Sequence, residues 1–185
     1  MSVGAPRLRR TWHLAKRFVG ALVPGGPSHS DEAWVKSVLP PALFAEWRSM
    51  PGHDRRHSIG VARRTRDGLR GVADMADDPE WVAAALVHDV GKLDAGLGVP
   101  GRVVATLTRG VLGQERTDRW VERRGVRLRF ARYFRHGALG ADRIRAAGGS
   151  EATARWAAAH HDPSRWAETG IPPAVMAALD AADDD

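Results

Sequence analysis

Proline and glycine cut this chain into short segments, and that division limits what it can fold into. Breaks are expected at Pro24-Gly25-Gly26-Pro27-Ser28, Pro40-Pro41, Pro51-Gly52, Pro100-Gly101, Gly148-Gly149, Asp162-Pro163 and Pro172-Pro173, because such residues start or end helices. Between the breaks, apolar residues recur at helical spacing, and no useful length alternates with period two. We therefore predict an all-α fold, a helical bundle.

The chain has 185 residues, enough for one domain with a real core and too few for two of ordinary size. We predict a helical domain over residues 29–185, preceded by a basic N-terminal helix and linker over residues 1–28. Within the domain, the main expected helices cover about residues 54–72, 80–88, 128–147 and 151–161, and a last one opens at Pro172-Pro173. Shorter helices are expected after Ser30-Asp31-Glu32 and around Leu43, Phe44 and Trp47.

Composition narrows the possible chemistry. There is no cysteine, which excludes disulfides, thiolate zinc sites and cysteine nucleophiles and fits a reducing compartment. Any metal must therefore be held by nitrogen and oxygen ligands. No apolar run reaches membrane-spanning length and no signal-peptide pattern opens the chain, so we expect a soluble, cytoplasmic protein.

The formal net charge is +6, mostly from arginine, and two interpretations stay open. The charge reflects either a compositional bias or a positive field that attracts anionic substrates or membrane lipid. Aromatic residues do not interleave with the arginines as a stacking platform requires, so a nucleic-acid polymer is not favoured as a partner. Residues 1–23 form a basic amphipathic stretch that lies on a membrane surface, docks on the domain or stays loose.

The basic stretch 102–135 is compatible with two structural interpretations. Val103, Leu107, Val111 and Leu112 form an apolar stripe within it. The stretch is interpreted either as a lid or substrate-selecting insertion, or as surface helices packed on the body.

Histidine and aspartate residues at wide intervals suggest a metal site assembled from several helices. The candidate ligands, in chain order, are His57, His88, Asp89, His136, His160 or His161, and an aspartate among Asp180, Asp183 and Asp184. Trp156 and His160 share a helix face, and His161 turns about 100° away from it. His160 is therefore the better inward ligand, and His161 is a group that supports a ligand, a substrate contact or an additional ligand.

Imidazole and carboxylate groups suit iron, manganese, zinc, nickel or cobalt. An aspartate can bridge two ions, and two such ions can activate water and clamp a phosphoryl group. Lys92 lies three residues after Asp89, where its cation can neutralise a bound phosphate.

The same residues resemble the HD-domain superfamily of metal-dependent phosphohydrolases. The resemblance covers roughly residues 50–185 and rests on the order His57, His88-Asp89, His136, His160 and a late aspartate. The run His88-Asp89-Val90-Gly91-Lys92 is similar to the HD-[IV]-G-K form of the HDIG and HD-GYP branches, and His160-His161-Asp162 is similar to the paired histidines of the HD-GYP branch.

The resemblance implies two divalent ions. It places His57, His88, Asp89 and a late aspartate on the first ion, with Asp89 bridging to a second ion completed by His136 and His160. Ala182-Asp183 fits the family's last ligand best, with Asp180 as the alternative. Lys92 matches the phosphate-contacting lysine of HD-GYP proteins.

The chain departs from the HD-GYP pattern after His161, where no Gly-Tyr-Pro follows, so hydrolysis of cyclic di-GMP is not implied. The expected function is hydrolysis of a phosphate ester, such as a nucleotide, with Asp89 and Lys92 at the reacting centre. Two alternatives remain: a nucleotide-sensing module without turnover, and a di-iron oxygenase on the same fold.

Overall fold

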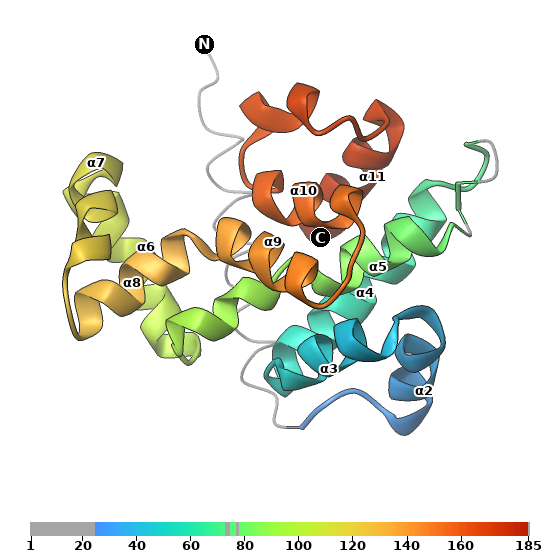
Figure 1. The fold of residues 1–185 in the computed structure, drawn as a ribbon, viewed down its shortest axis with the longest axis horizontal. Helices are drawn as coiled ribbons and strands as arrows, with labels where there is room; N and C mark the ends of the chain where they lie inside the picture. The colour runs from blue at the N-terminus through green and yellow to red at the C-terminus, as the bar shows by residue number, and fades with distance from the viewer. Residues whose placement is uncertain (1–24, 73–74, 77, 185) are drawn as a thin grey trace, which may run out of the picture.

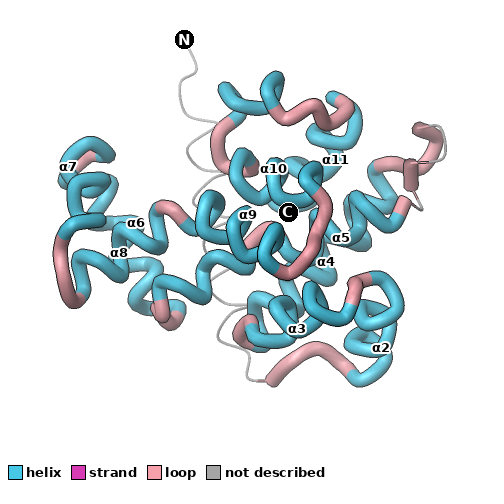
Figure 2. The backbone as a smooth tube through the Cα atoms, in the orientation of Figure 1, coloured by secondary structure: helices cyan, strands magenta, loops and turns pink. Residues whose placement is uncertain are grey.

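The computed structural model describes residues 25–72, 75–76 and 78–184. The basic stretch 1–23 lies outside these residues, so its predicted helix and membrane contact remain predictions. The described residues form helices joined by turns, without a strand among them, and the predicted all-α class is confirmed (Figure 2). No helix among them is long and apolar enough to cross a membrane.

The described residues form thirteen helical segments. In order they are α2 (His29–Val38), α3 (Pro41–Ser49), α4 (Gly52–Gly68), α5 (Pro79–Val87), the 3-10 helix η1 (Val90–Ala95), α6 (Val99–Leu112), α7 (Gln114–Asp118), η2 (Arg119–Glu122), α8 (Val126–Phe134), α9 (His136–Ala146), α10 (Glu151–Ala159), η3 (Pro163–Glu168) and α11 (Pro173–Asp184).

Side-chain caps start the helices close to where the sequence predicts. Ser28 accepts from the backbone N–H of Asp31 and completes a capping box at α2. Asp78 caps α5 through Glu80 N–H, and Ser150 caps α10 through Thr153 N–H. Each cap satisfies a backbone donor that the first turn leaves unpaired.

The prediction of one helix over about 128–147 is wrong, because the chain breaks there into α8 and α9. Arg135 sits between them with φ −104° and ψ 15°, and its N–H points back to the carbonyls of Ala131 and Arg132. The break turns His136 into the first residue of a new helix. The helix predicted over about 54–72 also differs: it runs from Gly52 to Gly68, and Gly71 adopts a positive φ of 88° just beyond it.

Helix α5 lies at the centre of the bundle. Every residue from Trp81 to Val87 is buried, as expected of a helix that is apolar all round. Helices α2, α3, α4, α10 and α11 all contact it. Trp47 and Trp156 are buried in the surrounding core, and the Trp47 indole donates to Ser58 Oγ at 2.9 Å, so its polar atom is satisfied.

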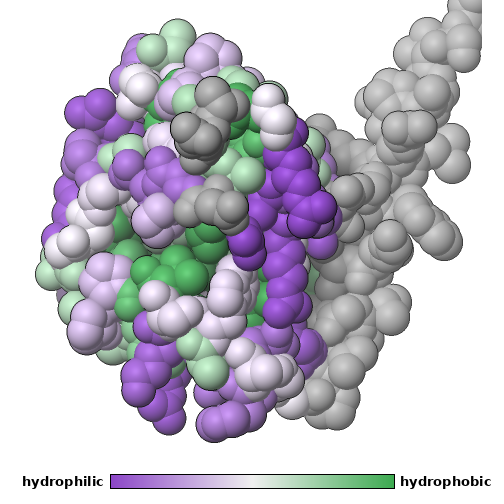
Figure 3. All heavy atoms as spheres, turned by 90° about the vertical axis from the view of Figure 1, so that its right-hand side faces the viewer, coloured by the Kyte–Doolittle hydropathy of each residue, from purple (hydrophilic) through white to green (hydrophobic). Residues whose placement is uncertain are grey.

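Helices α6, α7, η2 and α8 project from this body as a separate unit, at the left of Figure 1. We call residues 99–134 the arginine lobe. A second, smaller apolar cluster lies where it meets the body: Ala105 and Phe130 pack with Ala95 and Leu97, which precede the lobe, and Trp120, Tyr133 and Phe134 pack against them. The opposite side of the molecule faces the viewer in Figure 3, where hydrophobic side chains occupy a limited area between hydrophilic ones.

Two glycines let the backbone of α9 pack closely against η1 on one side and α10 on the other. A Cβ added at Gly91 would lie 2.0 Å from the carbonyl oxygen of His136 and 2.4 Å from the amide nitrogen of Gly140. A Cβ at Gly137 would likewise lie 2.7 Å from the carbonyl oxygen of Ala157 on α10. Helix α9 can therefore approach both η1 and α10 only because these positions carry no side chain.

We expect Gly91→Ala to destabilise the fold by more than about 2 kcal/mol, because the added methyl group meets backbone atoms that cannot move without separating η1 from α9. Chemical denaturation followed by circular dichroism measures the change. Gly110→Ala is the matched control: it lies inside α6 with nothing within 4 Å of the added Cβ, and should stabilise by about 0.4–1 kcal/mol. Equal effects at the two positions would contradict the packing argument.

Candidate metal centre

Helix ends deliver most of the candidate ligands to one place. His88 follows the last residue of α5, Asp89 immediately precedes η1, His136 opens α9 and His160 follows α10. His57 on α4 and Asp183 on α11 come from within their helices. Both approach the same centre, since α4 contacts both α5 and α11. The bundle thus gathers residues separated by up to 126 positions in the sequence.

The gathered side chains form two adjacent groups. His57, His88 and Asp183 make one, and Asp89, His136, His160 and His161 make the other; within each, one ligand atom per residue lies within 4.8 Å of all the others. Ligands that bind one ion at about 2.0–2.2 Å lie at most roughly 4.4 Å apart. Each group is therefore close to the size of a coordination sphere.

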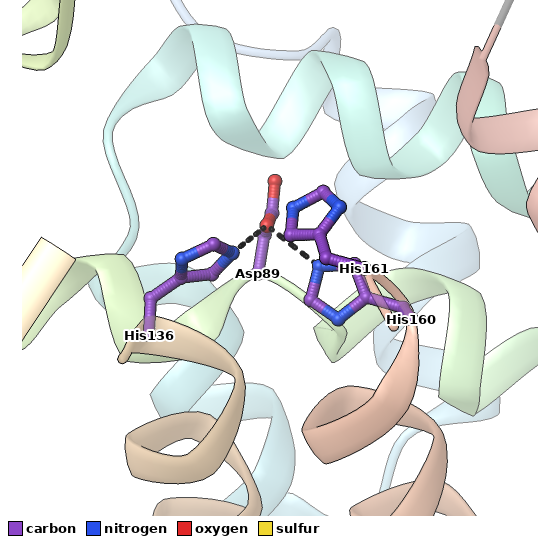
Figure 4. A group of neighbouring side chains, drawn as sticks. All are labelled: Asp89, His136, His160 and His161. Carbon is purple, nitrogen blue, oxygen red and sulfur yellow. Dashed lines mark ion pairs between the residues drawn. The ribbon is translucent and has the colours of Figure 1, made fainter. Parts of the chain in front are cut away.

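Asp89 stands between the two groups. Its Oδ1 lies 3.4 Å from His136 Nε2 and 3.7 Å from His160 Nε2, the two ion pairs drawn in Figure 4. Its Oδ2 lies 3.4 Å from His88 Nε2. One carboxylate thus presents an oxygen to each group, which is the placement of a bridging ligand.

Asp183 completes the first group. Its Oδ1 is 2.9 Å from His57 Nε2 and 3.4 Å from His88 Nε2, and the residue is buried. The structure brings neither of the other late aspartates into the two groups: Asp180 is half-buried, and Asp184 is exposed.

Backbone hydrogen bonds orient three of the imidazoles. The Nδ1 atoms of His88, His136 and His160 lie 2.7–2.8 Å from the carbonyl oxygens of Ala85, Tyr133 and Ala157, each three residues earlier. A carbonyl can only accept, so Nδ1 carries the hydrogen and, in the neutral ring, Nε2 keeps its lone pair. All three Nε2 atoms point into the site, as they do in metal-ligating histidines held by outer partners.

Four buried polar atoms at the centre have ion-pair neighbours but no hydrogen-bond partner. Nε2 of His88, His136 and His160 and Oδ1 of Asp89 are all buried and accept or donate no hydrogen bond. A buried polar group without a partner costs about 1–3 kcal/mol, and four such atoms converge here. A first-row divalent cation is the group whose ligand preference matches this donor set of imidazole nitrogens and carboxylate oxygens.

Burial and neighbouring charges shift the pKa values of several residues in the site. Burial disfavours charge on His88, but the carboxylates of Asp89 and Asp183 outweigh it and raise the pKa of His88 to about 10. Burial lowers the pKa of His136, with Lys92 and His160 adding to the effect. Asp89 is buried, yet Lys92 and His88 hold its pKa well below the usual range. The centre therefore retains carboxylate charge that attracts cations.

His161 and Lys92 lie at the edge of the second group. His161 is exposed as a residue, but its ring packs against those of His160 and His136, with centroids 4.0 and 5.1 Å away. Desolvation and these two rings lower the pKa of His161 to about 2, so it is a neutral potential ligand. Lys92 forms an ion pair with Asp89 Oδ2, the same oxygen that faces His88.

Two supporting residues escape a reading of the sequence. Arg64 lies on α4 two turns after His57, and its Nε and Nη2 donate to the carbonyl oxygen of Ala182 at 3.0 and 2.8 Å. This holds the end of α11, beside Asp183, against the helix that carries His57. Tyr133 stacks its ring on His136 at 5.7 Å and accepts from its Nδ1. The helical spacing of Arg64 from His57 is the only sequence signal for either.

A buried ion pair joins the arginine lobe to the site. Arg102, at the start of α6, donates through both terminal nitrogens to Asp54 on α4, each at 2.7 Å. Burial would raise the pKa of Asp54, but the guanidinium lowers it below its usual value. Asp54 lies three residues before His57, so the pair connects the lobe to the helix that supplies the first ligand.

Comparisons of the chain with protein-family models, with curated proteins and with solved structures found no match in any of the three. The centre is therefore interpreted from its own residues and geometry.

Because His88 keeps a proton at Nε2 up to about pH 10 when no cation is bound, a metal ion must displace that proton. We expect the affinity for Mn²⁺ to rise by up to about tenfold per pH unit between pH 6 and 9. Isothermal titration calorimetry in buffers of different ionisation enthalpy measures the protons released. His29→Ala, at an exposed histidine on α2, should keep the same slope. An affinity independent of pH would contradict this account of His88.

Proposed function

We propose that this protein is an HD-type, metal-dependent phosphohydrolase that acts on a phosphate ester such as a nucleotide. The observation that carries the proposal is the position of Asp89, buried with one oxygen toward each of two His/Asp groups whose imidazole Nε2 atoms converge without hydrogen-bond partners. The order of these residues along the chain is also what resembles the HD-domain superfamily.

In this proposal the residues divide between two ions. His57, His88, Asp183 and Asp89 would hold one, and Asp89, His136 and His160 the other, with His161 beside it. When bound, two such ions supply an activated water and neutralise a phosphoryl group during in-line displacement. The protein's part is to fix the donors in advance, through the carbonyl-held Nδ1 atoms, so that little reorganisation is needed.

Cationic side chains beside the centre favour a phosphate over a neutral substrate. Lys92 already lies against Asp89, with its side chain only 14% exposed. Burial lowers the pKa of the neighbouring His53, Asp54 opposes this, and Arg102, Arg56 and Lys92 add to the lowering, so these three cations lie on the same side of the site. Lys92 would orient and neutralise a phosphate oxygen once metal ions take over the charge of Asp89.

We expect Asp89→Asn to reduce both bound metal and hydrolysis, because it removes the shared ligand charge. Metal content measured by mass spectrometry should fall by at least one ion per chain, and hydrolysis of p-nitrophenyl phosphate or a nucleotide panel should fall by at least 1000-fold. Assays use protein loaded in turn with Mn, Fe, Ni, Co and Zn. His29→Ala is the matched control and should retain both properties.

Lys92→Met separates the metal from the substrate. It keeps a flexible, unbranched side chain, one atom shorter, but removes its charge, so we expect the metal content to stay and kcat/KM to fall by about 100-fold. If the wild-type protein binds nucleotide tightly without forming product, the proposed function changes from hydrolysis to nucleotide sensing. Oxygen consumption by the iron-loaded protein, with no phosphatase activity, would change it from hydrolysis to oxygenation.

A further inference from the structure

The positive charge of the chain is concentrated in the arginine lobe. Residues 99–134 contain nine arginines and three acidic residues, a balance of +6, which equals the formal charge of the whole chain. The remaining residues therefore balance to zero. Several of the lobe's arginines are exposed, including Arg116, Arg119, Arg123, Arg124 and Arg127.

The lobe also carries the exposed large hydrophobic side chains of the described part of the protein. They are Val103, Val104, Leu107, Val111, Val121 and Val126. Val104, Leu107 and Val111 follow the spacing i, i+3, i+7 on α6 and are 52%, 65% and 83% exposed. Helix α6 instead turns the small residue Ala105 toward the interior. Its larger apolar face is therefore left on the outside, contrary to the usual arrangement of a surface helix.

The composition of this surface distinguishes among possible partners. The aromatic side chains of the lobe pack on one another inside it, as Trp120 does with Phe130 and Tyr133 with Phe134, so they offer no stacking platform for nucleic acid. A second copy would bring together two lobes of charge +6, which disfavours a dimer through this face. What remains outside is a set of aliphatic side chains and a set of arginines, both exposed on the same lobe.

Such a surface fits the boundary of an anionic lipid bilayer. Aliphatic side chains can enter the region below the headgroups, while guanidinium groups meet lipid phosphates. Each arginine close to an anionic surface strengthens attachment by roughly fivefold. We propose that the arginine lobe docks this protein on anionic phospholipid, with the stripe Val104, Leu107 and Val111 inserted at the interface. The proposal is independent of the chemistry at the metal centre.

Vesicle sedimentation of the full chain tests this surface. The probes are vesicles of phosphatidylcholine alone and of phosphatidylcholine with 30% phosphatidylserine. Wild-type protein should sediment with the anionic vesicles and not with the neutral ones, and binding should weaken as salt rises. The double variant Leu107→Ser/Val111→Ser should bind at least tenfold more weakly, because it removes the apolar insertion. Arg123→Gln/Arg124→Gln should lose about 20-fold, because it removes two charges.

A charge-matched control lies outside the lobe. Arg48→Gln/Arg70→Gln removes two positive charges from exposed positions near the ends of α3 and α4, and should change binding by less than twofold. Each variant should keep the wild-type thermal midpoint and metal content, since its positions are exposed and distant from the ligands in sequence and packing.

Several results would overturn the proposal. One is wild-type protein that binds neutral and anionic vesicles equally, or neither. Another is vesicle binding that both lobe variants leave unchanged, which would place the contact elsewhere in the chain. A dimer in sedimentation velocity that Leu107→Ser/Val111→Ser dissolves would assign the stripe to a second copy. Tight binding of a labelled single-stranded RNA, lost in both lobe variants, would assign the lobe to nucleic acid.

Discussion

The close approach of backbones at Gly91, Gly140 and Gly137 is the contact on which the centre depends. Because these residues lack a Cβ, the first turn of α9 sits directly against η1 on one side and α10 on the other. His136, Asp89 and His160 are the residues that lie at those three element ends. A separation of even one methyl group would move the imidazole of His136 away from the carboxylate it faces.

The second constraint is that hydrogen bonds at Nδ1 orient the imidazole rings whose Nε2 atoms face the site. Three imidazoles give their Nδ1 hydrogens to carbonyls three residues earlier in the chain, and this leaves the other nitrogens buried and without a hydrogen-bond partner. Arg64 closes the far side by holding the carbonyl before Asp183. The helices are thus ordered by ordinary hydrogen bonds, while the atoms they surround keep their capacity to bind a cation. In each ring, Nδ1 holds the side chain in place and Nε2 is the atom that can bind a cation.

Features set by a few neighbouring residues could be predicted from the sequence. The starts at Asp78 and Ser150 could be predicted because capping is local, whereas α2 is capped by Ser28, two residues before the expected start at Ser30. The spacing of Trp156 and His160 indicated which imidazole turns inward. The break at Arg135 was not, because neither proline nor glycine stands there and the bend follows from packing between distant helices. The stripe on α6 was visible as a period, but a period does not tell whether the face is covered. Arg64 and Ala182 are 118 positions apart, a distance over which spacing carries no information.

The ion pair between Arg102 and Asp54 attaches the lobe to the helix that carries His57. Its two parallel hydrogen bonds are buried, and separating them leaves an uncompensated charge at a cost of about 3–5 kcal/mol. Asp54 and His57 share one turn of α4, so the lobe is attached to a helix and not to a loop. The pair therefore ties the arginine lobe to the turn of α4 that carries His57.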